Sequence, residues 1–172
     1  MPLDVRNEII ASRAVEFQLD NAFWELEDEW IEPGGLRFNV IYRSCRDAEE
    51  EVERRLVQYM ASLGYTTAYC FSVSHCKILV DANGWLAALQ RQTRQGYPDG
   101  LLKAILERNR PVLGGGMHSC YIQQIKAASV RQDPVSLNHR VAAWLASYFD
   151  ILFAINGRFH PGEKRLHLRP GS

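Results

Sequence analysis

Hydrophobic and polar residues alternate in two short stretches near the N-terminus. Over residues 23–31 three glutamates share one side and the apolar side chains share the other, and residues 36–43 alternate in the same way. A period of two on both sides of the turn sequence at 32–35 predicts a β-hairpin. If odd-numbered residues pair with odd-numbered ones, opposite charges face each other and two aromatic rings stack. This register predicts the neighbours Glu25 with Arg43, Glu29 with Asn39, and Trp30 with Phe38.

From residue 44 onward the pattern becomes that of amphipathic helices. Ser44 or Asp47 can cap the first of them, its early turns are acidic, and Gly64 is expected to end it. Its apolar stripe comprises Val52, Leu56, Tyr59 and Met60. Residues 65–80 are equally compatible with a strand and with a buried helix. Further helices are predicted at 3–14, from Asp81 through Leu89, from Tyr97-Pro98 to a break at Arg110-Pro111, at 117–131, and at 135–156 after Asp133-Pro134.

These elements together predict an α+β fold, with a short N-terminal β-hairpin or small antiparallel sheet followed by a mainly α-helical bundle. We place the division between residues 1–45 and residues 46–172. The 172 residues are enough to bury a core without disulfides or metals. The last helix is apolar nearly all round, which predicts that it lies at the centre of the bundle.

Charge and composition narrow the class of protein. Lys+Arg and Asp+Glu both number 20, so no overall positive field favours duplex DNA or a membrane surface. No apolar run approaches the ~20 residues that span a bilayer. The N-terminus lacks the basic-then-apolar layout of a secretory signal. We therefore expect a cytoplasmic protein with reduced cysteines.

Cations gather directly after the last predicted helix. Asn156-Gly157 is a natural helix stop, because both residues tolerate the left-handed conformation. A cationic, titratable block at the mouth of an apolar core predicts a site for a polyanionic ligand, such as a nucleotide or its phosphates. The block comprises Arg158, His160, Lys164 and Arg165.

Asp150 is a carboxylate on an otherwise apolar helix. Its burial without a cationic partner would raise its pKa, so a structural ion pair is the favoured interpretation. The candidate partners are Arg131, Arg140 and Lys164.

A cysteine and histidine set allows a different chemistry. Its members could supply soft ligands to a tetrahedral zinc ion, but their spacing matches no common zinc signature, and buried thiols also behave as small apolar groups. A cysteine–histidine nucleophile pair would lack an orienting third group. Whether this set binds metal stays open at this point. The set is Cys70, His75, Cys76, His118 and Cys120.

Two weaker candidates lie elsewhere. Gly114-Gly115-Gly116 before a helix could wrap a phosphate, although no Gly-Lys-Ser/Thr follows and a flexible connection is favoured. The glutamate face of the hairpin, with Glu29 and Asn39, could hold a divalent cation. A solvated strand face paired to Arg37 and Arg43 is the favoured interpretation.

Several segments together resemble the C-terminal half of bacterial polymerase-β-type nucleotidyltransferases. They are FNVIYRS, DANGWLAAL, AASVRQDPVSLNHR and FDILFAINGRFHPGEKRL, and the resemblance spans residues 20–168. It implies that residues 1–45 are the remnant sheet element of a nucleotidyltransferase-like module. It also implies that Lys164, Arg165, His160 and Arg158 serve the nucleotide, with Asn39 beside a metal ion and Glu29, Asp150 and Arg131 in support.

The sequence departs from that family at its catalytic centre. The Gly-Ser loop with two carboxylates one residue apart, which holds magnesium and the triphosphate, does not occur, and the chain is expected to begin after it. Asn39 stands where the third carboxylate belongs. Phosphoryl transfer by this chain alone is therefore chemically implausible. We expect a protein that binds a nucleotide with magnesium, or a small-molecule acceptor. The alternative is a non-catalytic interaction module, either a homodimer or the partner of a separate catalytic subunit.

Overall fold

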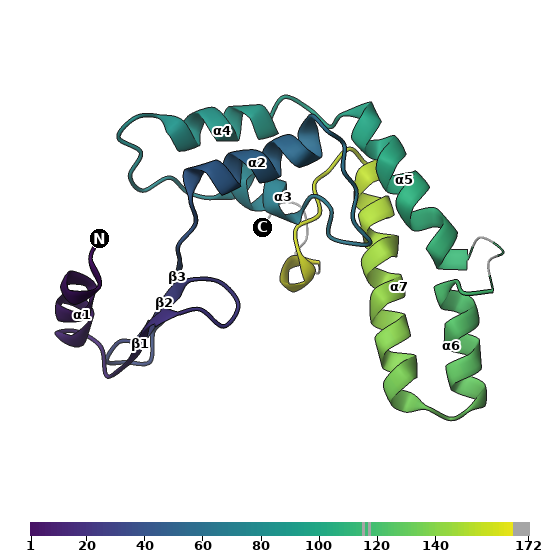
Figure 1. The fold of residues 1–172 in the computed structure, drawn as a ribbon, viewed down its shortest axis with the longest axis horizontal. Coiled ribbons are helices and arrows are strands. Elements are labelled where there is room, and N and C mark those ends of the chain that lie inside the picture. Colours follow the sequence, from purple (N-terminus) through teal and green to yellow (C-terminus); the bar gives the residue numbers. More distant parts are fainter. Residues whose placement is uncertain (115, 117, 167–172) are drawn as a thin grey trace. The chain divides into compact units, whose positions relative to one another are not determined.

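The computed structural model describes residues 1–172 apart from 115, 117 and 167–172, and it leaves the side chain of residue 165 undescribed. It confirms an α+β fold, with a three-stranded antiparallel sheet near the N-terminus and helices after it (Figure 1). The chain divides into two compact units, Met1–Ala48 and Glu49–Ser172, which we describe separately.

The first unit contains the helix α1 (Leu3–Ala11) and the strands β1 (Glu16–Asn21), β2 (Glu27–Ile31) and β3 (Arg37–Ile41) in the order β1-β2-β3. The predicted hairpin is β2–β3, and its register is confirmed at each expected pair. Glu29 lies opposite Asn39, and the rings of Trp30 and Phe38 stack with centroids 4.8 Å apart. Glu25 forms an ion pair with Arg43.

A buried ionic cluster joins α1 to this sheet. The Arg6 guanidinium donates to both oxygens of Asp28, at 2.6 and 2.7 Å, and also to Asp20. Burial alone would raise the pKa of Asp28, but hydrogen bonds from the Tyr42 hydroxyl, the Asp20 amide and Arg6 hold it below its ordinary value. The Asp28 carboxylate is therefore ionised, and its charge is balanced by Arg6. This ion pair anchors α1 on β2.

The hairpin prediction was wrong in its extent. Sequence alternation placed a strand from residue 23, whereas β2 begins at Glu27 and a further strand, β1, precedes it. Phe23 and Trp24 lie in the connection between β1 and β2, and Trp24 is 92% exposed instead of packing on the apolar face. Asp28 lies on the face of β2 that carries Trp30, and it is buried there. The alternating pattern predicted only apolar residues on this face.

The second unit is helical. The helices α5 and α6 both pack along α7, as Figure 1 shows, and Leu101, Ile105 and Ala154 form the buried centre of the core. The helix α7 starts at Pro134, next to the predicted start at residue 135, and Asp133 caps it by accepting from the Ser136 amide. The elements are α2 (Cys45–Leu56), α3 (Ala68–His75), α4 (Trp85–Thr93), α5 (Asp99–Gly114), α6 (Tyr121–Val130), α7 (Pro134–Ile155) and the short 3-10 helix η1 (Glu163–Arg165).

Three predicted helix ends are corrected. The helix α2 stops at Leu56 and not at Gly64, since Tyr59 has a left-handed backbone with φ +53° that no α-helix contains. The helix α4 starts at Trp85, and Asp81 instead accepts a hydrogen bond from the Ala87 amide. Pro111 does not break α5, which continues through it to Gly114. The ambiguous stretch 65–80 contains the helix α3.

Gly64 marks the closest approach between the α2–α3 connection and α7. Its φ is +81°, and an added Cβ atom would lie 2.8 Å from the Cβ of Ala146. Its amide donates to the buried Asn109 side chain at 3.1 Å. Only glycine suits this position, because both the backbone conformation and the space exclude a side chain.

We expect Gly64→Ala to lower the free energy of unfolding by about 2–4 kcal/mol, from left-handed strain plus overpacking. Gly84→Ala is the matched control, because Gly84 also has a positive φ, of +67°, but an added Cβ would meet nothing within 4 Å. It should cost about 1 kcal/mol. Urea unfolding followed by circular dichroism measures both, and equal losses would contradict the close approach.

Candidate functional site

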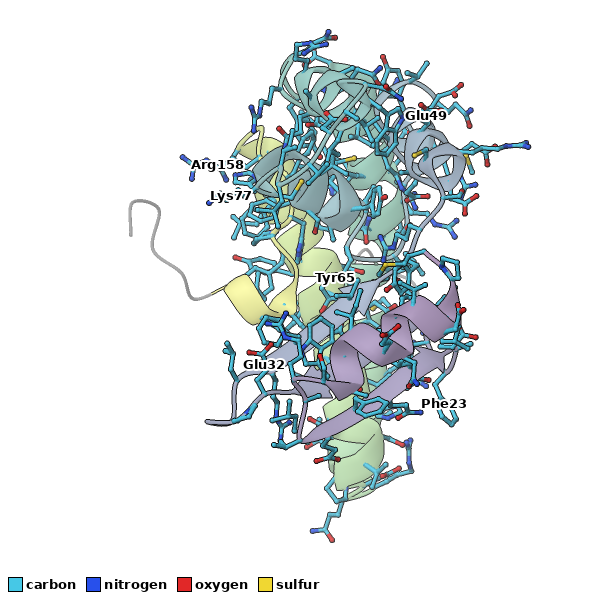
Figure 2. All side chains as sticks on the ribbon, turned by 90° about the vertical axis from the view of Figure 1, so that its left-hand side faces the viewer. Phe23, Glu32, Glu49, Tyr65, Lys77 and Arg158 are labelled. Atoms are coloured by element: carbon cyan, nitrogen blue, oxygen red, sulfur yellow. The ribbon has the colours of Figure 1, made fainter. Side chains whose placement is uncertain are left out.

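The expected anion-binding block is divided by the structure. Arg158 follows the end of α7 with an exposed side chain that points away from the ribbon (Figure 2), and Lys164 is exposed in η1. The Arg165 side chain lies outside the described residues. His160 lies inside the core at 0% exposure. His160 therefore cannot share an exposed anion with Arg158 and Lys164.

His160 is a neutral core residue. Its ring packs against Tyr65 and Phe153, with centroids 4.8 and 5.1 Å away, and its Nδ1 accepts from the Gly162 amide. Burial lowers its pKa to about 4. The prediction that His160 is a cation for phosphate is therefore corrected, since the ring carries no charge at neutral pH while it stays buried.

Asp150 has a partner that the sequence did not suggest. Its two oxygens accept from the amide and the hydroxyl of Thr66, at 3.0 and 2.6 Å. Burial raises the pKa of Asp150 to about 6, against the lowering effect of these bonds and of Arg55. Thr66 thus takes the place of the three candidate cations, Arg131, Arg140 and Lys164, and the Arg131 guanidinium lies 3.9 Å from Asp133. The neutral donors of Thr66 are 84 residues away from Asp150 in the sequence.

Asn109 complements this bond on the other side of the connection between α2 and α3. Its side-chain oxygen accepts from the Gly64 amide, and its nitrogen donates to the carbonyls of Ser62 and Ile105. Asn109 and Asp150 are both buried, so their bonds are shielded from water. Their evident role is to fix the backbone of residues 62–66.

The amide of Asn39 lies between two carboxylates. Its nitrogen donates to Glu27 at 2.8 Å and to Glu29 at 2.9 Å, and Glu27 also accepts from Asn21. These contacts form a polar ladder across the sheet. Among the described residues, no group of three or more histidine, cysteine or acidic side chains is placed to hold a metal ion.

The remaining candidates are separated or lie partly outside the description. Cys70 and Cys120 are buried, Cys76 is exposed, and each is a free thiol. Burial raises the pKa of Cys70 to about 12, which makes it a poor nucleophile. The glycine run at 114–116 includes residue 115, which lies outside the described residues, so its suggested phosphate loop is not described.

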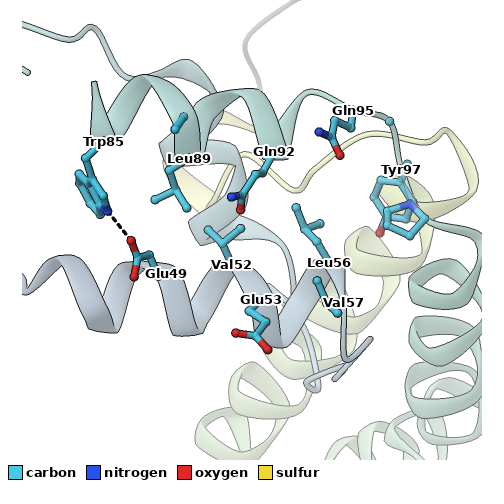
Figure 3. Close-up of a pocket in the computed structure, with 13 residues that line it drawn as sticks. Glu49, Val52, Glu53, Leu56, Val57, Trp85, Leu89, Gln92, Gln95 and Tyr97 are labelled. Atoms are coloured by element: carbon cyan, nitrogen blue, oxygen red, sulfur yellow. Dashed lines mark hydrogen bonds between the residues drawn. The ribbon is translucent and has the colours of Figure 1, made fainter. Parts of the chain in front are cut away.

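The structure contains a groove that the sequence did not reveal. It lies between α2 and α4, has a volume of about 710 Å³, and is closed at one end by Tyr97 and Pro98 (Figure 3). Val52 and Leu89 are buried at its base. The α2 wall carries Glu49 and Glu53, and the Trp85 indole donates to Glu49 across the groove at 2.6 Å. Gln92 and Gln95 supply the other polar lining.

The turn at residues 157–159, which carries Arg158, contacts Tyr97 at the closed end of this groove. Tyr97, which lines the groove, packs on Phe159 with ring centroids 5.6 Å apart, and Gly157 also approaches Tyr97. The turn that carries Arg158 therefore supports Tyr97, although Arg158 is not itself part of the lining. One end of the predicted cationic block thus adjoins the groove.

Both walls of the groove were predicted as core-facing helix stripes, which explains why sequence reasoning missed it. Val52 and Leu56 on one helix, and Trp85 and Leu89 on the other, have the spacing of buried positions. The available signal was polar residues bordering those stripes, at Glu53 and at the glutamines of α4. Periodicity gives no information on whether two such helices pack closely or stand apart.

Comparison with known proteins does not assign this chain to a family. No protein-family model, curated protein or solved structure matches this chain. Separately, none of the helices in the described part of the chain has the length and apolar character needed to cross a membrane.

The buried Asp150 carboxylate should make stability depend on pH. Its folded pKa of about 6 exceeds the ordinary value of 3.8, so the stability it contributes is present below 3.8 and lost as pH rises through 6. Asp150→Asn removes this dependence. The unfolding free energy of the variant minus that of the unmodified protein should increase by about 2–3 kcal/mol between pH 4 and pH 7.

Urea unfolding at several pH values measures this difference. Subtraction is needed because His160 acts in the opposite sense, losing stability as pH falls from 6.5 toward about 4. Glu107→Gln, at an exposed carboxylate of α5, is the matched control. A difference for Asp150→Asn that is the same at pH 4 and pH 7 would refute the assignment.

Proposed function

We propose that this chain binds a small organic molecule in the groove between α2 and α4, as the acceptor-binding part of a nucleotidyltransferase-like protein. The observation that carries the proposal is the groove itself. It combines a buried aliphatic base, two aromatic residues and a few polar groups along its edges, which is the usual composition of small-molecule sites. The nucleotidyltransferase context rests on the sequence resemblance alone.

The lining favours an acceptor over a nucleotide. Among the described residues, neither Lys nor Arg belongs to it, and two of its residues are glutamates. A triphosphate in this groove would meet negative charge without a counter-ion. The exposed side chains of Arg158 and Lys164 remain the proposed contacts for a nucleotide with magnesium, outside the groove.

A second candidate function is protein interaction. The adjacent residues Phe23 and Trp24 are 85% and 92% exposed in the connection between β1 and β2, and exposed aromatic residues are enriched in interaction sites. This observation favours the module hypothesis, with a second copy of the chain or a separate catalytic subunit as the partner. Light scattering of the purified protein and of Trp24→Ser tests self-association, and a monomer in both cases counts against the homodimer.

We expect groove ligands to shift the NMR signal of the Trp85 indole N–H, because this group spans the groove to Glu49. A panel of amines, polyols, carboxylates and the four nucleoside triphosphates with magnesium is titrated into the labelled protein. Hits should lose at least tenfold in affinity in Ala88→Phe, which fills the groove. Ala142→Phe, at an exposed alanine of α7, is the matched control.

The outcomes separate the two sites. Shifts confined to α2 and α4 that disappear in Ala88→Phe support the groove. Nucleotide binding that is lost in Lys164→Ala and kept in Ala88→Phe supports the phosphate contacts instead. No groove shift with any compound of the panel would overturn the proposed function.

A further inference from the structure

Glu49 and Glu53 form a matched pair of carboxylates on the groove wall. They are four residues apart on α2, so they project from the same side of the helix, about 6 Å apart along its axis. Figure 3 shows both on the α2 side of the groove. Two like charges at this spacing repel each other and slightly destabilise a helix.

Each carboxylate accepts a hydrogen bond from a neutral donor in the described part of the chain. Glu49 accepts from the Trp85 indole, and Glu53 accepts a long hydrogen bond from Gln58 at 3.4 Å. The neighbouring Glu51, outside the groove, is paired with both Arg54 and Arg55. Among the described residues, Arg54 and Arg55 thus pair with Glu51 and not with the two groove glutamates.

The rest of the groove suits the remaining parts of a cationic ligand. Leu56 and Val57 offer apolar surface against which a methylene chain can pack, above the buried Val52 and Leu89. The Trp85 ring at one end provides a face for a cation–π contact. Gln92 and Gln95 add amide oxygens that accept hydrogen bonds from an ammonium group.

We propose that the ligand of this groove is a diamine or polyamine, with two ammonium groups held by Glu49 and Glu53 and the intervening methylene chain on the apolar base. The proposal rests on the proposed function and names its ligand class. Two charges at a fixed spacing, joined by an apolar segment, complement the two carboxylates and the apolar base between the helices. A neutral polyol would leave both carboxylates without a counter-charge.

The test is an NMR titration of the full chain with four probes of similar length. Butane-1,4-diamine and spermidine should shift the Trp85 indole signal and the α2 amides. Butylamine, which has one charge, should bind about tenfold more weakly, and butane-1,4-diol more weakly still. Raising the salt concentration should weaken the diamine more than the monoamine.

Charge-removing variants identify the carboxylates. Glu49→Gln keeps an oxygen for the indole and Glu53→Gln keeps the side-chain shape, so both should fold, which their amide spectra check. Each should lower diamine affinity about five- to tenfold, and the double variant should bind butane-1,4-diamine no better than butylamine. Glu107→Gln, which removes an exposed carboxylate outside the groove lining, is the matched control and should change nothing.

Two failures are distinguishable. If the diol or other neutral compounds shift the groove signals while the diamines do not, the ligand class is wrong and the proposed function stands. If diamines bind equally well to the double variant, the two glutamates are not the site and the inference is overturned. Silence from every compound overturns the groove as a binding site altogether.

Discussion

The hydrogen bonds from Thr66 to Asp150 are the constraint on which the helical unit depends. Both oxygens of the buried Asp150 carboxylate accept hydrogen bonds, one from the Thr66 amide and one from the Thr66 hydroxyl. Such a bond is costly to leave unmade, because the buried carboxylate would then have no compensation. The connection between α2 and α3 is thereby held against α7, and Asn109 on α5 holds the same segment two residues earlier, at Gly64.

The groove follows from this attachment. The connection fixes where α2 ends, and Leu56 of α2 packs on the core of α5 and α7. It also fixes where α3 begins, and α3 in turn positions α4, because the Gln90 side chain donates to the carbonyls of Val73 and Cys76. The two walls of the groove are therefore held through buried polar bonds, and α2 and α4 need not fill the space between them.

How much was predictable from the sequence depends on the range of the interaction. The hairpin register was predictable, since alternation over a few residues allows only one pairing that places Trp30 on Phe38 and Glu29 by Asn39. The burial of Asp28 was not, because its partner Arg6 is 22 residues away on a helix with little amphipathic pattern. The partners of Asp150 were predicted wrongly for the same reason. Its burial was inferred correctly, but its partners are neutral groups in a distant loop, whereas local reasoning looked for a cation.

The cationic block after α7 shows why charge composition alone misplaces a site. Four basic or titratable residues predicted one anion site, but His160 packs among aromatic rings and is neutral, while Arg158 is exposed to solvent. The groove that Tyr97 closes has the opposite charge on its wall. An acidic groove favours a cationic ligand, and the described cations of the block lie outside its lining.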